Sequence, residues 1–481
     1  MTNHLFNSID EAQQFLEQQF GENESFDVGI KRIYVKELPV LCVFISGLVN
    51  SMVLTEVLSY ISPTEEITEI EEDNTYFEQH FNFYAKSKVE ARKELLVSVL
   101  SGQVVFITLN GFVFSAELRE YPGREPQEPD NEKVIRGSRD GFTESINKNT
   151  ALIRRRIRNT QLRFELHKIS TVGQTDVALG YLKDTVNEDH LNWLRDRLKK
   201  IQHDGLTMAD KSLEEWLFKQ RFNPVPFVRY TERPDITAAH ILEGHIAILV
   251  DTSPSVILVP ITLFHLLQHA EEYRQAPAVG TVVRFLRYFG TTMSLLLMPL
   301  WYLFATNEHL LPKALSFLGA EEKSTIPLLL QIIIGDVGLE FLRMAAIHTP
   351  TPLSTAIGLV AGVMIGQIAI DVGLFSGEVI LYLAITAIFN YAIPSYELSV
   401  SVKIFRILLL IATGIADQNG LFIALLLVFS YLCALKPMNV PYLWPLVPFF
   451  PNAFLRVFVR FPMTTDALRP YVVGAKQRKR S

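Results

Sequence analysis

The stretch FLRYFGTTMSLLLMPLWYLF, residues 285–304, decides the fold class of this chain. It is almost entirely apolar, and about 20 such residues form an α-helix that can cross the roughly 30 Å hydrocarbon core of a membrane. Further apolar blocks follow at 353–370, 379–393, 404–416 and 421–435. The sequence therefore predicts an all-α polytopic membrane domain.

A sixth apolar block, 326–347, is ambiguous because it contains Asp336, Glu340 and Arg343. It is either a span that faces a wet interior or a helix that lies in the membrane interface. We expect five or six transmembrane helices. Six is preferred, because six crossings return the basic C-terminal tail to the cytoplasmic side, where Lys and Arg are enriched.

The charge distribution separates this helical part from the rest of the 481-residue chain. Residues 1–283 contain 41 acidic and 30 basic residues, whereas residues 284–481 contain 10 acidic and 15 basic ones. The charge-rich first part is typical of a soluble domain. The two cysteines, Cys42 and Cys433, fall one in each part, so we expect no disulfide framework and two inert buried thiols.

The soluble part alternates helical periods with short β-rich runs, which predicts an α/β fold in two lobes. Three hairpins are expected, formed by 104–109 with 112–116 across Asn110-Gly111, by 162–169 with 175–181, and by 246–251 with 256–259. The Pro-rich segment 121–129 marks the boundary between the lobes.

The predicted organisation has four segments. These are a cytoplasmic α/β lobe I (1–125), a cytoplasmic α/β lobe II with a juxtamembrane hairpin and an interfacial helix (126–283), a transmembrane helical domain (284–440), and a basic cytoplasmic tail (441–481).

Several motifs make the sequence resemble the A subunits of the GerA family of spore germination receptors. They are EKVIRGSRDGFTE (132–144), NTALIRRRI (149–157), GHIAILVDTSP (244–254) and AIPSY (392–396). Within that family, QHAEEYRQAPAVGT (268–281) is most similar to a paralogue that acts at a sporulation stage. The resemblance covers almost the whole chain.

The resemblance implies a multi-pass protein of the spore inner membrane. A subunits are thought to assemble into a homo-oligomeric ring and to conduct ions at germination, together with other germination membrane proteins. Nutrient recognition is attributed to a separate permease-like subunit, so this chain would be the conducting part. Its partners would be membrane lipid, further copies of itself and inorganic cations.

A small-residue repeat formed by Gly358, Gly362 and Gly366 precedes Gln367 and Asp371. Small residues four apart let helices approach closely in lipid. Gln367 and Asp371 share a helical face, so they either line an ion path or belong to tight internal packing with Asp371 at the headgroup level.

Asp336 and Glu340 form a second polar pair, four residues apart on one helical face. In a ring of identical subunits, one carboxylate per chain becomes a belt that favours cations. The alternative is a Glu340–Arg343 pair at the membrane interface. We expect cation over anion selectivity.

A basic cluster could serve a subunit interface or contact an anion. Its members are Arg136, Arg139, Arg154, Arg155, Arg156 and Arg158. The last four either pair with the acidic surface of a neighbouring lobe or form a solvated helix face. Nucleic-acid binding is not expected, because the soluble part is acidic and the cluster lacks interleaved aromatic residues.

No motif for an enzyme, a cofactor or a metal site is found in the sequence. We therefore expect no cofactor and no catalytic residue. Three functions stay open: an oligomeric ion channel, a non-conducting scaffold for germination proteins, and an alternating-access carrier.

Overall fold

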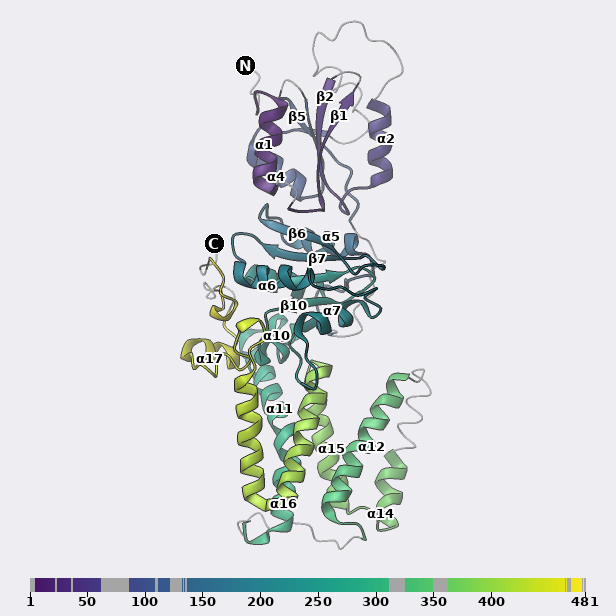
Figure 1. Cartoon of the computed structure of the whole chain (residues 1–481), viewed down its shortest axis with the longest axis vertical. Helices are drawn as coiled ribbons and strands as arrows, with labels where there is room; N and C mark the ends of the chain where they lie inside the picture. Colours follow the sequence, from purple (N-terminus) through teal and green to yellow (C-terminus); the bar gives the residue numbers. More distant parts are fainter. Residues whose placement is uncertain are drawn as a thin grey trace. The chain divides into compact units, whose positions relative to one another are not determined.

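The structure is a computed structural model that describes residues 5–21, 24–35, 38–61, 86–108, 111–121, 132, 134, 136–310, 325–348, 362–462, 464, 469–477 and 479. The chain divides into two compact units. Unit 1 comprises Met1–Gln220, Val228–Ile261 and Met463–Ser481, and unit 2 comprises Arg221–Phe227 and Thr262–Pro462. Unit 1 is built from sheets and helices, and unit 2 is helical (Figure 1).

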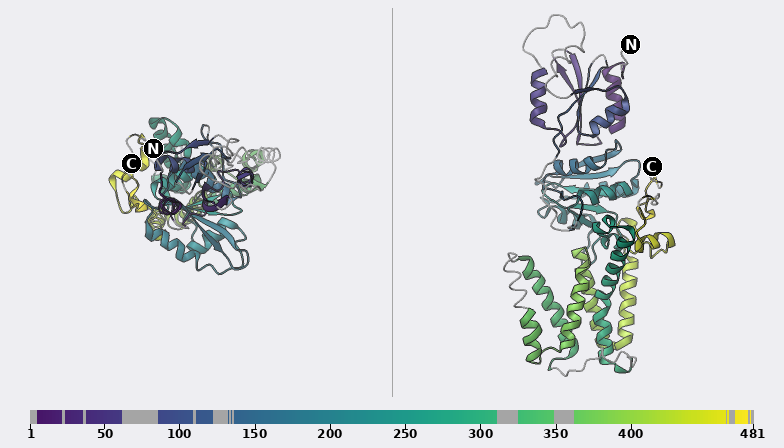
Figure 2. Two further views of the ribbon diagram at one scale, coloured as in Figure 1. Left: turned by 90° about the horizontal axis from the view of Figure 1, so that it is seen from above. Right: turned by 180° about the vertical axis from the view of Figure 1, so that it is seen from behind.

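Within the described residues, the first sheet of unit 1 has the strand order β1-β2-β4-β5-β3, and each neighbouring pair is antiparallel. Its strands are β1 (Val28–Val35), β2 (Leu38–Ile45), β3 (Lys86–Lys88), β4 (Val104–Ile107) and β5 (Val113–Ala116). Helices α1 (Ile9–Phe20) and α4 (Arg92–Leu100) lie on one face of the sheet, and α2 (Ser51–Ile61) lies on the other (Figure 2).

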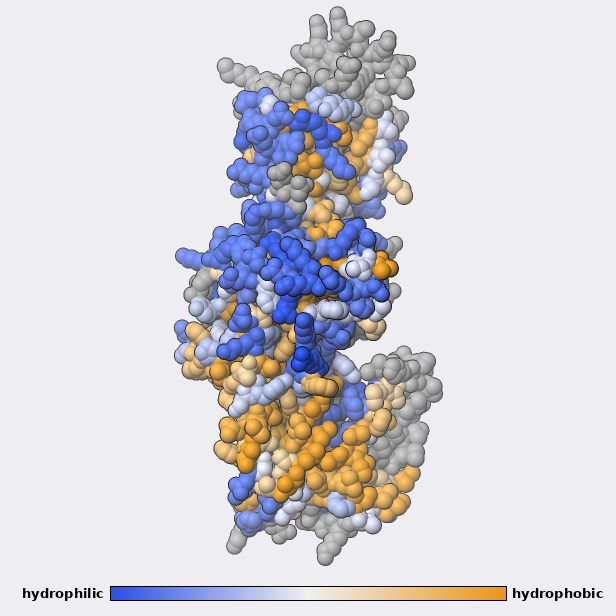
Figure 3. Space-filling view, viewed as in Figure 1, coloured by the Kyte–Doolittle hydropathy of each residue, from blue (hydrophilic) through white to orange (hydrophobic). Residues whose placement is uncertain are grey.

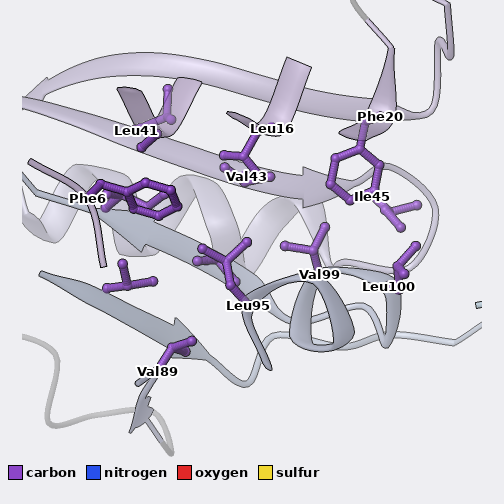
Figure 4. Packing of buried hydrophobic residues seen from close by; sticks show 14 of the residues in the cluster. Phe6, Leu16, Phe20, Leu41, Val43, Ile45, Val89, Leu95, Val99 and Leu100 are labelled. Carbon is purple, nitrogen blue, oxygen red and sulfur yellow. The ribbon is translucent and has the colours of Figure 1, made fainter. Parts of the chain in front are cut away.

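Apolar side chains on both faces of β2 allow helices to pack on both sides of the sheet, because successive side chains of a strand point to opposite faces. Leu41, Val43 and Ile45 pack with α1 and α4 in one buried cluster, as Figure 4 shows. Val40 and Cys42 belong to the cluster on the α2 side. Burial raises the pKa of the Cys42 thiol to about 12, so the thiol is unreactive at neutral pH.

Helix α1 follows directly from its local sequence. Its buried residues Ile9, Ala12, Leu16 and Phe20 recur at spacings of three and four, which places them on one face of the helix. The Ser8 hydroxyl caps the N-terminus by accepting a hydrogen bond from the Glu11 amide at 3.1 Å.

The second sheet of unit 1 has the order β6-β7-β9-β10-β8 among the described residues and is again antiparallel. Its strands are β6 (Leu162–Ile169), β7 (Thr175–Leu182), β8 (Arg229–Thr231), β9 (Ile246–Val250) and β10 (Val256–Val259). Its helices are α5 (Ile146–Arg156), α6 (Glu188–Leu198), α7 (Ala209–Phe218) and α8 (Pro234–Glu243).

All three predicted hairpins are confirmed by the strand pairing of β4 with β5, β6 with β7, and β9 with β10. Asn110 of the first turn lies outside the described residues, but Gly111 has a φ of 71°. An added Cβ at Gly111 would collide with the Phe6 carbonyl. Glycine is therefore required there.

Unit 2 begins with two short helices, and longer helices follow (Figure 1). The described elements are α9 (Leu263–Leu266), α10 (Ala270–Arg274), α11 (Pro277–Thr306), η1 (Glu308–Leu310), α12 (Leu328–His348), η3 (Met364–Ile368), α14 (Ala369–Asp371), α15 (Gly377–Tyr391), α16 (Tyr396–Ala434), η4 (Pro437–Asn439) and α17 (Pro451–Phe458). The short helix η6 (Tyr471–Val473) belongs to unit 1.

Helix α16 is interrupted at Ala416 and Asp417, whose backbone angles are not helical. The rings of Phe405 and Tyr431 lie 6.3 Å apart, although a straight helix would separate them by about 39 Å at 1.5 Å per residue. The chain therefore reverses at this point, and the two halves of α16 run antiparallel (Figure 1). They correspond to the predicted blocks 404–416 and 421–435.

In the described part of the chain, α11 and α16 are long and apolar enough to cross a membrane, and α15 is a shorter apolar helix. Apolar side chains dominate the visible surface of the helical unit (Figure 3). The ambiguous block 326–347 forms helix α12 with its three charged residues inside. The predicted number of five or six spans stays a prediction.

Candidate functional site

A buried ion pair joins helices α12 and α16 of the helical unit. The Arg406 guanidinium of α16 donates to both oxygens of the Asp336 carboxylate on α12, at 2.5 and 3.3 Å. The side chains of Arg406 and Asp336 are only 1% and 4% exposed. Buried charges are costly unless paired and hydrogen-bonded, so each of these residues requires the other.

The same guanidinium extends the network to two more helices. Arg406 Nη1 donates to the Ser294 carbonyl of α11 at 2.9 Å. The Ser294 hydroxyl donates to the Asn390 side-chain oxygen of α15 at 3.1 Å. The network therefore connects α11, α12, α15 and α16.

A second ion pair lies beside the first. Lys403 Nζ is 2.5 Å from a Glu340 oxygen, and Arg343 approaches the same carboxylate at 4.0 Å. Arg343 also donates to the Ser399 hydroxyl at 3.1 Å and lies over the Tyr396 ring at 4.4 Å.

These charged residues line a cavity of about 10 Å³ together with Leu339, Ala387, Asn390 and Tyr391. That volume is about what one water molecule needs. The cluster contains two carboxylates and three basic groups, so its net charge is positive.

The structure places Asp336 and Glu340 on one face of α12, as their spacing predicts, and pairs each with a basic residue of the same chain. Sequence reasoning missed these partners. A signal existed, because Lys403 comes directly before the apolar block 404–416 and Arg406 interrupts it, just as Asp336 and Glu340 interrupt the block 326–347. The predicted belt of free carboxylates would require both pairs to separate.

The second candidate path lies on the segment 362–371. Gly358 is outside the described residues. An added Cβ at Gly362 or Gly366 would meet no atom within 4 Å, so no described helix packs against the side of either glycine on which a side chain would stand. Gln367 and Asp371 are exposed, and the structure does not bring them to the charged cluster.

The basic cluster of unit 1 separates into buried and exposed members. Arg154 is fully buried and donates to both oxygens of Asp27 at 2.9 Å. It also donates to the Leu162 carbonyl at 3.1 Å. The Arg154 guanidinium therefore pairs with a carboxylate of the other lobe of the same chain, in line with the first of the two alternatives, and Arg154 does not belong to a solvated helix face.

The other arginines lie nearer to solvent. Arg156 pairs with Asp140 at 2.5 Å. Burial alone would raise the pKa of Asp140, but the hydrogen bonds from Arg156 and Ser138 outweigh it and lower the pKa. Arg155 lies over the Tyr121 ring at 4.6 Å. The remaining three, Arg136, Arg139 and Arg158, are exposed.

Comparison with known proteins settles the family. The family model described as Bacillus/Clostridium GerA spore germination protein matches residues 14–472. The chain belongs to the GerA family.

Members of the GerA family match nearly the full length of the chain. Stage V sporulation protein AF of Bacillus subtilis is 44% identical over 97% of this chain and 95% of its own length. Spore germination protein KA of the same organism is 29% identical over 98% of this chain and 88% of its own length. The first match agrees with the likeness of residues 268–281 to a sporulation-stage paralogue.

A solved structure also matches part of the chain. It is the crystal structure of the N-terminal domain of the A subunit of the Bacillus megaterium spore germinant receptor GerK3. The identity is 27%, the TM-score is 0.42, and the match covers 54% of this chain and 97% of that one.

The described residues contain no group of three or more His, Cys, Asp or Glu side chains placed to hold a metal ion. The two relatives compared above are named as a sporulation protein and a germination protein.

Proposed function

We propose that this GerA-family chain is an A-type subunit that forms a homo-oligomeric ring in the spore inner membrane and conducts cations during germination. It works there with other germination membrane proteins, and its α/β lobes lie in the cytoplasm. The four segments 1–125, 126–283, 284–440 and 441–481 are part of the same proposal.

The path of the C-terminal residues supports an even number of membrane crossings. The Lys476 amide donates to the Thr185 carbonyl at 2.9 Å, and its ammonium bonds to Glu188 at 2.8 Å. Arg469 donates to the Leu242 carbonyl at 2.8 Å. Residues before and after the helical unit thus belong to one compact unit, which favours six crossings over five.

The observation that carries the proposal is the exposure of two polar side chains on segment 362–371. Asp371 and Gln367 are exposed beside exposed apolar residues, Ile368 and Val372. An ionisable side chain in a membrane domain normally faces water or a protein partner. In a ring of identical subunits, Asp371 would repeat once per chain and attract cations.

The test is ion flux into liposomes that contain the full chain, with and without a co-reconstituted germination protein. We expect the Asp371→Asn variant to lose cation selectivity several-fold, and Gln367→Ala to reduce the current. The control is Asp417→Asn, which removes a carboxylate at the reversal of α16. Anion preference in the unmodified protein, or unchanged selectivity in Asp371→Asn, would contradict the proposal.

A non-conducting scaffold is the second candidate. It is favoured by the pairing of Asp336 with Arg406 and of Glu340 with Lys403, because neither carboxylate of this charged cluster is then free to attract a cation. Unitary currents would indicate a channel, saturable slow flux a carrier, and silence with retained complex formation a scaffold.

A further inference from the structure

Helix α17 and its flanking residues expose three large apolar side chains. Phe449, Leu455 and Phe461 are 60%, 52% and 38% exposed. Apolar side chains are visible on the surface over α17 in Figure 3. Arg456 is also exposed, next to Leu455, and lies 5.6 Å from the centre of the Phe461 ring. Aromatic and arginine side chains thus share one surface.

This surface is held at the first turns of α11. The ring of Phe458 lies 5.0 Å from that of Tyr288. Arg284 of α11 donates to the carbonyls of Arg456 and Val457 at 2.9 and 3.3 Å. The Arg460 amide donates to the Thr281 hydroxyl at 3.1 Å. Helix α17 therefore lies beside the N-terminal end of a helix long and apolar enough to span a membrane.

The charges around this junction are mainly positive. The buried Glu272 carboxylate pairs with both Arg284 and Arg287. Arg456 and Arg460 of the α17 segment add two more positive charges. A helix that combines an apolar side with arginine residues is suited to the membrane interface, and its positive charge complements anionic phospholipids.

We propose that residues 449–461 form an interfacial anchor for an anionic phospholipid bilayer. Phe449, Leu455 and Phe461 insert among the acyl chains, and Arg456 binds the phosphate of an anionic lipid. The anchor fixes the depth of α11 and holds its first turn at the headgroup level. This inference rests on the membrane location in the proposed function.

The experiment uses the full chain with single cysteines that carry an environment-sensitive fluorophore. Cys433→Ser removes the partly exposed native thiol, and Cys42 is buried with a high pKa, so it does not label. The probe positions are Phe449→Cys and Leu455→Cys. The reference is Phe289→Cys, at a 46% exposed position within α11.

Each labelled protein is reconstituted into phosphatidylcholine vesicles, with or without phosphatidylglycerol, that contain brominated lipids as quenchers. We expect quenching at 449 and 455 to be comparable with that at 289. In vesicles that contain phosphatidylglycerol, Arg456→Gln should lower the quenching at position 449 to the level that the protein with Arg456 shows in vesicles without phosphatidylglycerol.

Quenching at 289 but not at 449 or 455 would overturn the anchor and leave the membrane location intact. A second copy of the chain covering the surface would produce this result. The absence of quenching at all three positions would overturn the membrane location and the anchor together. Quenching at 449 and 455 that is independent of both phosphatidylglycerol and Arg456 would overturn the role of the arginine.

Discussion

Breaking the Asp336–Arg406 pair should destabilise the helical unit more than removing both of its members. Arg406→Met leaves a carboxylate that is 4% exposed without its two hydrogen bonds from the guanidinium. It also removes the Arg406 contacts with Ser294 at 2.9 and 3.3 Å. Loss of one partner of a buried ion pair costs about 3–5 kcal/mol. Replacing both partners by apolar side chains is often neutral or stabilising by about 1–4 kcal/mol.

The assay is thermal unfolding of the full chain in detergent, followed by tryptophan fluorescence, because Trp301 belongs to the buried cluster of the helical unit. Each kcal/mol shifts the midpoint by about 2–4 °C in a unit of this size, so Arg406→Met should lower Tm by roughly 6–20 °C. Adding Asp336→Leu should recover most of that loss.

The matched control is Lys403→Met on the same helix, whose partner Glu340 is 21% exposed and can still be hydrated. We expect a smaller loss for this variant than for Arg406→Met. Equal losses in Arg406→Met and in the double variant, or a single-variant loss within error of zero, would refute the buried-pair argument.

Three further outcomes follow from unit 1 and the reversal of α16. Arg154→Met should destabilise unit 1 by about 3–5 kcal/mol, because it leaves the buried Asp27 carboxylate without its guanidinium partner. Denaturant unfolding measures the loss of stability, and an unchanged unfolding midpoint would contradict this prediction. Burial would raise the pKa of Glu165, but hydrogen bonds from basic neighbours outweigh it and lower the pKa to about 2. The ionised Glu165 carboxylate therefore stabilises the fold fully above pH 4.5, its ordinary pKa, and this contribution is lost as the pH falls from 4.5 to about 2. Acid unfolding of the unmodified chain, with Glu165→Gln as the control, measures this loss. Gly420→Ala should cost about 1–3 kcal/mol, because the added methyl group collides with the Ala412 carbonyl; a Tm equal to that of the unmodified chain would show that the α16 reversal adjusts freely.

Local patterns alone predicted the secondary structure of much of the chain. The hairpin of β6 and β7 and the two apolar halves of α16 each depend on residues close together in sequence. The positions of Asp336 and Glu340 on one helical face followed from their spacing for the same reason. A period of 3.6 or 2 is a property of a single segment and needs no knowledge of its neighbours.

Only the tertiary structure decided what those carboxylates contact. Arg406 is 70 positions from Asp336, and Asp27 is 127 positions from Arg154. Whether such residues meet depends on which helices and lobes pack together, and spacing along one segment carries no such information. Packing therefore decided that Asp336 and Glu340 are paired within the chain, and that Arg154 pairs with a carboxylate of the other lobe and is not on a solvated helix face.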